Sequence, residues 1–179
     1  MLTLVTGGSG SGKSAFAEDR VLSFGEAQRY YIATMYCFDE ESKKRIQRHR
    51  MMRKGKGFDT IERYTDLKNL EISKGSVVIL ECMSNLVANE MFQEQGAKEH
   101  TVQAVLEGVK AIKERTEHFV IVTNEIFSEA ASYEGETKIY QKYLGEINQG
   151  IASMADEVVE VVYGIPIFHK GVKNEKLME

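Results

Sequence analysis

The stretch GGSGSGKS, residues 7–14, decides the fold of this chain. An apolar, β-prone run at residues 2–6 precedes it, and residues 15–24 after it have the pattern of an amphipathic helix that Gly25 ends. A glycine loop between a strand and a helix can turn its backbone N–H groups toward phosphate oxygens, with the positive end of the helix facing the anion. The alternative is a glycine-rich turn that binds nothing, which the flanking strand and helix disfavour. The sequence therefore predicts a phosphate-binding P-loop made by Gly7, Gly8, Ser9, Gly10, Ser11, Gly12, Lys13 and Ser14.

Three side chains are candidates for the chemistry at this loop. Lys13 can reach the β- and γ-phosphates of a nucleotide, and the hydroxyl of Ser14 can bind Mg²⁺. Residues 76–82 form an apolar run closed by Glu81, which is typical of a buried parallel strand. An acid at this place resembles the Walker B carboxylate that supports the Mg²⁺ of a nucleotide, so we predict that role for Glu81. The alternative for Glu81 is an acid that is bonded only to neighbouring backbone.

Length and composition indicate an ordinary globular protein. The chain has 179 residues, 42% hydrophobic and 28% charged, so we expect a single nucleotide-binding domain over residues 1–179. No apolar run approaches the roughly 18 to 20 residues that a membrane span requires, and we expect a cytoplasmic protein. The two cysteines, Cys37 and Cys82, are too few and too far apart for a disulfide framework or a zinc site.

Basic charge is concentrated in one segment. Residues 43–56 contain eight Lys or Arg and no Asp or Glu, although the whole chain has a net charge of −4. Asp39 can cap a helix that runs to about Met52, and the spacing of Arg45, His49 and Arg53 places these three on one face. A single basic helix in a protein that is otherwise acidic favours binding of a small polyanion such as a nucleotide over binding of a nucleic acid.

Strand and helix patterns alternate along the chain. The expected strands are residues 2–6, 29–35, 58–64, 76–82, 119–123 and 156–162, with a short edge strand at 165–168, and the expected helices are 15–24, 39–52, 66–72, 83–95, 97–116 and 136–154. We expect Thr65 to cap the helix at 66–72. This order predicts an α/β fold with a mostly parallel sheet and helices on both faces. Ligands of such sheets bind at the carboxyl ends of the strands, where Thr6, Thr34, Glu81 and Glu125 would gather.

Several separated motifs agree with one family. They are LVTGGSGSGKS at 4–14, YIAT at 31–34, RIQRHR at 45–50, LEC at 80–82, VTNE at 122–125 and INQGIASMADEVVEVVYGIP at 147–166. With these motifs the sequence resembles the bifunctional adenosylcobinamide kinase/adenosylcobinamide-phosphate guanylyltransferase family of cobalamin biosynthesis, and the motifs occur in the order that the family has. The resemblance covers nearly the whole chain and implies a RecA-like P-loop NTPase domain.

The resemblance also implies two reactions. First, ATP or GTP with Mg²⁺ would phosphorylate a hydroxyl of adenosylcobinamide; second, a histidine would take GMP from GTP and pass it to adenosylcobinamide phosphate. By motif position His49 is that nucleophile, and an imidazole can attack phosphorus only when it is neutral. The resemblance further implies a homotrimer. We also predict that Thr34, Arg45, Arg53 and Glu62 contact the nucleotide, and that His100, His118 and His169 are surface or structural residues.

The sequence departs from the family pattern at three places. Gly10 stands where an arginine is usual, Phe58 where a Trp-like aromatic is usual, and residues 126–136, IFSEAASYEGE, lack the usual proline. Two other functions therefore stay open: a P-loop kinase for another small metabolite, and a GTP-binding protein that signals through a partner docked on the basic helix.

Overall fold

One seven-stranded sheet forms the centre of the molecule. The computed structural model describes residues 1–125 and 135–171. The strands are β1 (Leu2–Thr6), β2 (Arg29–Ala33), β3 (Phe58–Glu62), β4 (Val77–Glu81), β5 (His118–Val122), β6 (Glu157–Val162) and β7 (Ile165–Lys170). Their order is β3-β2-β4-β5-β1-β6-β7, and every pairing is parallel except that of β6 with β7. The predicted mostly parallel sheet and its extra edge strand are confirmed.

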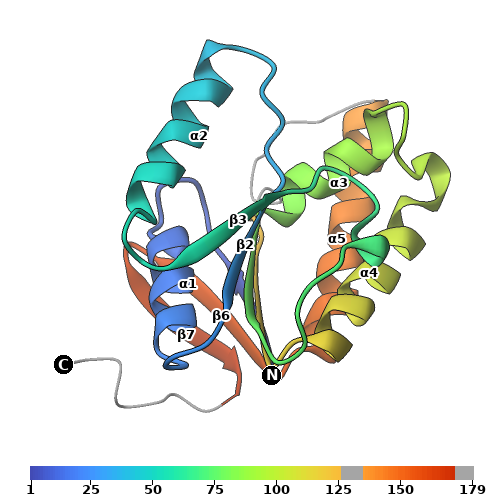
Figure 1. Ribbon diagram of the computed structural model, residues 1–179. Helices are drawn as coiled ribbons and strands as arrows, with labels where there is room; N and C mark the ends of the chain where they lie inside the picture. Colours follow the sequence, from blue (N-terminus) through green and yellow to red (C-terminus); the bar gives the residue numbers. More distant parts are fainter. Residues whose placement is uncertain (126–134, 172–179) are drawn as a thin grey trace.

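Helices cover both faces of this sheet, as expected. The helices are α1 (Lys13–Leu22), α2 (Glu40–Met52), α3 (Met83–Phe92), α4 (Thr101–Arg115) and α5 (Glu136–Met154), with short 3-10 turns η1 (Leu67–Asn69) and η2 (Lys98–His100). Figure 1 shows α1 on one face of the sheet and α3, α4 and α5 on the other, while α2 stands above α1. None of the helices in the described part of the chain is long and apolar enough to cross a membrane.

Strand β4 shows why a buried parallel strand is apolar throughout. Val78 and Leu80 belong to the core beneath α3, α4 and α5, whereas Val77 and Ile79 belong to the core beneath α1. Successive side chains of a strand point to opposite faces, so a strand covered on both sides must be apolar at every position. The same strand ends at Glu81, which lies at the edge where the chain turns into α3.

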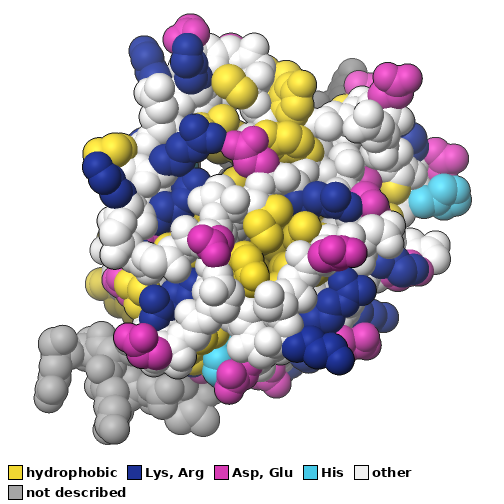
Figure 2. All heavy atoms as spheres, in the orientation of Figure 1, with side chains coloured by type: hydrophobic (Ala, Val, Ile, Leu, Met, Phe, Trp, Pro, Cys, Tyr) yellow, Lys and Arg dark blue, Asp and Glu magenta, His cyan; other side chains and the backbone are white. Residues whose placement is uncertain are grey.

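Helix α2 differs from the other helices because it has no buried residue. Asp39 is its N-cap, as predicted: its carboxylate accepts a hydrogen bond from Ser42 N at 2.7 Å, and the Ser42 hydroxyl accepts one from Asp39 N. Arg53 closes the other end and is buried. Figure 2 shows Lys and Arg side chains gathered along this helix. The helix is therefore fixed at its ends, and its middle is open to solvent or a ligand.

The helix expected over residues 66–72 is absent, and this expectation was wrong. Asp66 has a φ of 54°, in the left-handed region, so it cannot begin a right-handed helix. Its backbone N–H donates to Glu90 Oε1, and its carbonyl accepts from the Arg63 guanidinium. Only the three residues of η1 follow. Leu67, in η1, is almost fully buried, so tertiary packing overrides the local helical pattern.

A buried ion pair joins α1 to β6. Arg20 donates to Glu157 through Nε at 3.1 Å and through Nη2 at 2.8 Å, and the Thr3 hydroxyl donates to the same carboxylate. Removing one partner of a buried pair leaves the other charge uncompensated. We therefore expect Glu157→Ala to lower the free energy of unfolding by about 3 to 5 kcal/mol, measured by urea denaturation.

Glu146→Ala is the control for this prediction, because Glu146 pairs with Lys142 on the exposed side of α5. This variant should leave the free energy of unfolding nearly unchanged. Equal destabilisation by both variants would contradict the assigned importance of the buried pair.

Candidate active site

The glycine loop lies between β1 and α1, in the order of elements that the sequence predicts. Gly7 has a φ of 154° and Gly12 one of 93°; an added Cβ would meet Val161 O at 2.6 Å and Gly164 Cα at 3.3 Å, respectively. Both positions therefore require glycine. Gly12 leads into α1, and Lys13 folds back across the loop, where its Nζ donates to Gly8 O at 3.0 Å. Burial lowers the pKa of Lys13, and the nearby Glu81 carboxylate partly offsets this effect.

Glu81 lies directly beside the P-loop helix. The Ser14 hydroxyl donates to Glu81 Oε1 at 2.5 Å, and the Tyr31 hydroxyl donates to Oε2 at 2.8 Å. The carboxylate thus contacts side chains, and the alternative of an acid bonded only to backbone does not apply. A hydroxyl and a carboxylate in contact are the oxygen donors that Mg²⁺ accepts in nucleotide sites, so these residues fit such an ion.

Helix α2 brings His49 to the same carboxylate. His49 Nδ1 is 3.6 Å from Glu81 Oε1, which is too long for a hydrogen bond. This ring nitrogen is buried and has no hydrogen-bond partner among the residues that the structure describes. A buried polar atom without a partner is uncommon in native proteins. His49 Nδ1 is therefore available to contact a ligand that binds beside Ser14 and Lys13.

The end of α2 holds a second group of cations. Arg53 donates through Nε to Thr60 Oγ1 at 3.1 Å, and its guanidinium carbon lies 4.1 Å from the centre of the Tyr31 ring. Arg50, Arg53 and Lys54 line a cavity of about 630 Å³ at this end of the helix. The positive side chains that line this cavity could bind anionic phosphate oxygens.

The predicted site residues do not all converge. The structure brings Lys13, Ser14, His49 and Glu81 together, with Arg53 one turn beyond His49. Thr34 is fully buried, and its hydroxyl both donates to Cys82 O and accepts from Cys82 N, so it holds the residue after Glu81 and does not face the crevice.

Arg45 and Glu62 lie outside this group. Arg45 is exposed and donates to Glu41 at 2.5 Å, one turn earlier on α2. Glu62 accepts from Arg50 at 2.7 Å and from the Tyr64 hydroxyl. In this conformation the side chains of both residues are engaged with protein partners. Of the three residues expected on one face of α2, His49 lies near Glu81 and Arg53 lies on Tyr31, whereas Arg45 contacts neither.

Other predictions concern the edge of the sheet and the remaining histidines. Glu125 lies beside the P-loop, where its backbone N donates to Gly7 O at 3.1 Å. His118 stacks on Phe24 with the ring centres 3.7 Å apart, His169 contacts Glu160, and His100 is exposed. Of the altered segment at residues 126–136, residues 126–134 lie outside the described part of the chain.

Sequence reasoning missed Tyr31. It lies inside an apolar strand and is almost fully buried, so its pattern is that of an ordinary core residue. Burial, followed by the Glu81 charge, raises the pKa of Tyr31, so its hydroxyl keeps the proton that it donates to Glu81. Only the alignment of β2 with β4, which pairs Tyr31 with Ile79, shows that the hydroxyl can reach this carboxylate.

Two solved structures share the fold of this chain. An ATPase of the type III secretion system has a TM-score of 0.55 at 10% identity, over 98% of this chain and 60% of its own. The flagellar accessory protein FlaH from Methanocaldococcus jannaschii has a TM-score of 0.50 at 14% identity, over 95% of this chain and 78% of its own. These similarities show a RecA-like P-loop NTPase fold and, at such low identity, nothing further.

Curated relatives are more informative because they match almost end to end. The bifunctional adenosylcobalamin biosynthesis protein CobU of Escherichia coli is 34% identical over 93% of this chain and 98% of its own length. CobU of Salmonella typhimurium is 32% identical, and CobP of Pseudomonas aeruginosa is 27% identical over 96% of this chain. The family pattern described as "Cobinamide kinase / cobinamide phosphate guanyltransferase" matches residues 3–168. On this match and these relatives, the chain belongs to the cobinamide kinase/cobinamide phosphate guanyltransferase family.

Proposed function

We propose that this protein phosphorylates adenosylcobinamide with ATP or GTP and then transfers GMP from GTP to the product through a guanylyl-histidine at His49. The observation that carries the proposal is the convergence of His49 with Lys13, Ser14 and Glu81, which we call the P-loop group. His49 Nδ1 is 3.6 Å from the Glu81 oxygen that also accepts from Ser14. A simple P-loop kinase needs no histidine at this place.

In the kinase step the P-loop holds the triphosphate and Lys13 neutralises charge on its β- and γ-phosphates. Ser14 and Glu81 would hold Mg²⁺, which supplies further neutralisation of phosphate charge when it is bound. The acceptor hydroxyl forms a bond to the γ-phosphorus, the bond from that phosphorus to the bridging oxygen breaks, and a nucleoside diphosphate leaves. The hydroxyl proton is released to solvent.

In the guanylyl step a neutral His49 nitrogen forms a bond to the α-phosphorus of GTP, and pyrophosphate leaves. Arg50, Arg53 and Lys54 line the neighbouring cavity and would balance the charge of that leaving group. The phosphate oxygen of adenosylcobinamide phosphate then attacks the same phosphorus. The N–P bond breaks and His49 is regenerated.

Labelled GTP tests the proposal directly. We expect protein incubated with α-labelled GTP and Mg²⁺ to become covalently labelled, and adenosylcobinamide phosphate to remove the label. We expect γ-labelled GTP or ATP to label adenosylcobinamide itself. Label on adenosylcobinamide without any protein label would support the kinase step alone. Loss of the γ-label from the nucleotide without labelled adenosylcobinamide or protein would favour the small-metabolite kinase, and reversible binding without turnover would favour the GTP-binding protein.

Glu81→Gln is expected to lower Mg²⁺-dependent phosphoryl transfer by about 10²-fold or more, because the amide keeps the shape of the side chain but loses the charge that supports the ion. Nucleotide affinity measured in EDTA should change much less. The measurement compares initial rates with Mg²⁺ against equilibrium binding of GTP without metal.

Glu160→Gln is the control, since Glu160 is an acid of β6 that contacts His169 at the surface. A loss of GTP affinity in EDTA as large as the loss of the Mg²⁺-dependent rate in Glu81→Gln would contradict the assigned role and indicate a structural one.

A further inference from the structure

An aromatic pocket lies at the carboxyl edge of the sheet, beyond the P-loop group. We use this name for a cavity of about 900 Å³ whose aromatic lining is Tyr36, Phe38, Tyr64 and Phe92. Phe38 is 76% exposed and Phe92 51%, although large apolar side chains at this level of exposure are usually scattered singly. Here they are grouped: the ring centres of Tyr36 and Phe38 are 4.8 Å apart, and those of Tyr36 and Tyr64 are 5.1 Å apart.

The pocket is continuous with the space between α2 and α3. A second cavity, of about 480 Å³, shares Tyr36, Phe38 and Phe92 and extends along both helices to Arg45 and Asn85. Figure 2 shows hydrophobic side chains gathered in this region beside the basic side chains of α2. Helix α2 also carries His49, and α3 begins just after Glu81, so the second cavity lies along two helices that both lead to the candidate active site.

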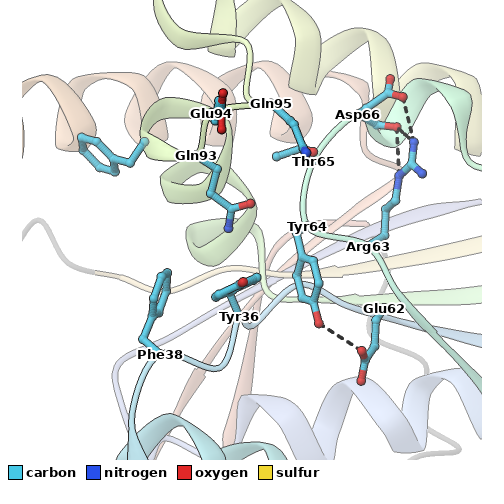
Figure 3. A pocket seen from close by; sticks show the side chains of 11 residues that line it. Tyr36, Phe38, Glu62, Arg63, Tyr64, Thr65, Asp66, Gln93, Glu94 and Gln95 are labelled. Carbon is cyan, nitrogen blue, oxygen red and sulfur yellow. Dashed lines mark hydrogen bonds and ion pairs between the residues drawn. The ribbon is translucent and has the colours of Figure 1, made fainter.

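The polar lining of the pocket consists mostly of groups that do not attract phosphate. Gln93 and Gln95 present side-chain amides, and Figure 3 shows Gln93 directed toward the aromatic rings. The one cation of this lining, Arg63, is paired with Asp66, while Glu62 and Glu94 are acidic. A ligand that fits is large and flat, has apolar faces for the rings, and carries neutral amide groups for the glutamines.

We propose that the aromatic pocket binds the corrin ring of the cobinamide acceptor, with the hydroxyl arm extended between α2 and α3 toward Lys13 and His49. A corrin is a broad ring with an apolar surface and amide-bearing arms, which matches the lining in both size and chemistry. A purine base alone would fill only a small part of a 900 Å³ cavity. This inference rests on the proposed function, because the acceptor hydroxyl has a reason to approach the P-loop only if it receives a phosphoryl group.

Phe38→Ala and Phe92→Ala test the assignment. Each should weaken binding of adenosylcobinamide by about tenfold, which is about 1.4 kcal/mol, since each removes one ring contact. Binding is measured by equilibrium dialysis with adenosylcobinamide alone, without nucleotide or Mg²⁺. Ile165→Ala is the matched control, because Ile165 is 64% exposed on β7 at the opposite edge of the sheet. It should leave binding unchanged.

Two further measurements exclude other occupants. In Phe38→Ala the covalent label from α-labelled GTP should form at the normal rate, and sedimentation should show the oligomer of the unchanged protein. Weaker GTP binding with normal corrinoid binding would overturn the proposal in favour of a nucleobase site. A changed oligomer with normal corrinoid binding would overturn it in favour of a subunit contact.

The experiment separates this inference from the proposed function. If the unchanged protein binds adenosylcobinamide and the two variants bind it about tenfold more weakly, the pocket assignment stands even where no label is transferred. If labelling and transfer occur but both variants bind and use adenosylcobinamide normally, the function stands and the pocket assignment fails. Absence of corrinoid binding by the unchanged protein overturns the assignment as well.

Discussion

Lys13→Ala is expected to abolish γ-phosphoryl transfer, with a loss of about 10³-fold or more in rate, and to weaken triphosphate binding. Lys13 is the only side-chain cation within residues 7–14. Its Nζ lies across the loop, 3.0 Å from Gly8 O, on the loop that would hold the phosphates. The measurement is transfer of label from γ-labelled ATP or GTP to adenosylcobinamide.

The fold should survive this change. The hydrogen bond from Lys13 to Gly8 is local, and the neighbouring core residues of α1, such as Ala17 and Val21, are unaffected. Lys110→Ala, an exposed lysine on α4, is the control and should retain full activity. Near-normal turnover by Lys13→Ala would show that the nucleotide binds elsewhere.

Local patterns were enough to predict the P-loop and the strand that ends at Glu81. In both cases the covalent order of residues restricts the geometry: a strand, a glycine loop and a helix can connect in few ways, and parallel strands must end at one edge. The contact between Ser14 and Glu81, 67 residues apart in the chain, follows from that edge. Helix α2 was also predicted with its cap, because Asp39 and Ser42 act within one turn.

The rest depended on tertiary contacts that no local pattern contains. Tyr31 has the sequence pattern of a core residue, yet its hydroxyl bonds to Glu81 across two neighbouring strands. Thr34 was expected at the nucleotide and instead holds the backbone of Cys82. Arg45 fits the spacing of a shared helical face, but Glu41 on the same helix is its ion-pair partner. In each case the polar partner that decided the position could not be identified from spacing alone.

The aromatic pocket illustrates the same limit. Tyr36 and Phe38 follow β2, Tyr64 follows β3, and Phe92 ends α3. In the sequence these are four separate apolar residues near element ends, each of which could belong to a core. Their grouping depends on the neighbouring positions of β2 and β3 and on the direction in which α3 leaves β4.

His49→Asn is expected to eliminate covalent labelling from α-labelled GTP and to retain part of the γ-phosphoryl transfer. Asparagine offers no nucleophilic ring nitrogen, whereas γ-transfer depends on Lys13 and on the Ser14 and Glu81 pair, which do not need the imidazole. The 3.6 Å distance from His49 Nδ1 to Glu81 Oε1 is not a hydrogen bond, so the carboxylate keeps its bonds to Ser14 and Tyr31 in the variant. The two activities should therefore separate.

The chemistry of the adduct gives this prediction a second measurement. A phosphoramidate on His49 should be labile in acid and stable in alkali, in contrast to an ester of serine or threonine. His100→Asn is the matched control, since His100 is exposed on η2 and lies outside the P-loop group; its labelling should be normal. Arg53→Ala should slow labelling without preventing it, because Arg53 supports Tyr31 and adds positive charge but supplies no acceptor atom. If His49→Asn accumulates label at the normal rate, another nucleophile carries the GMP and the proposed second reaction is wrong.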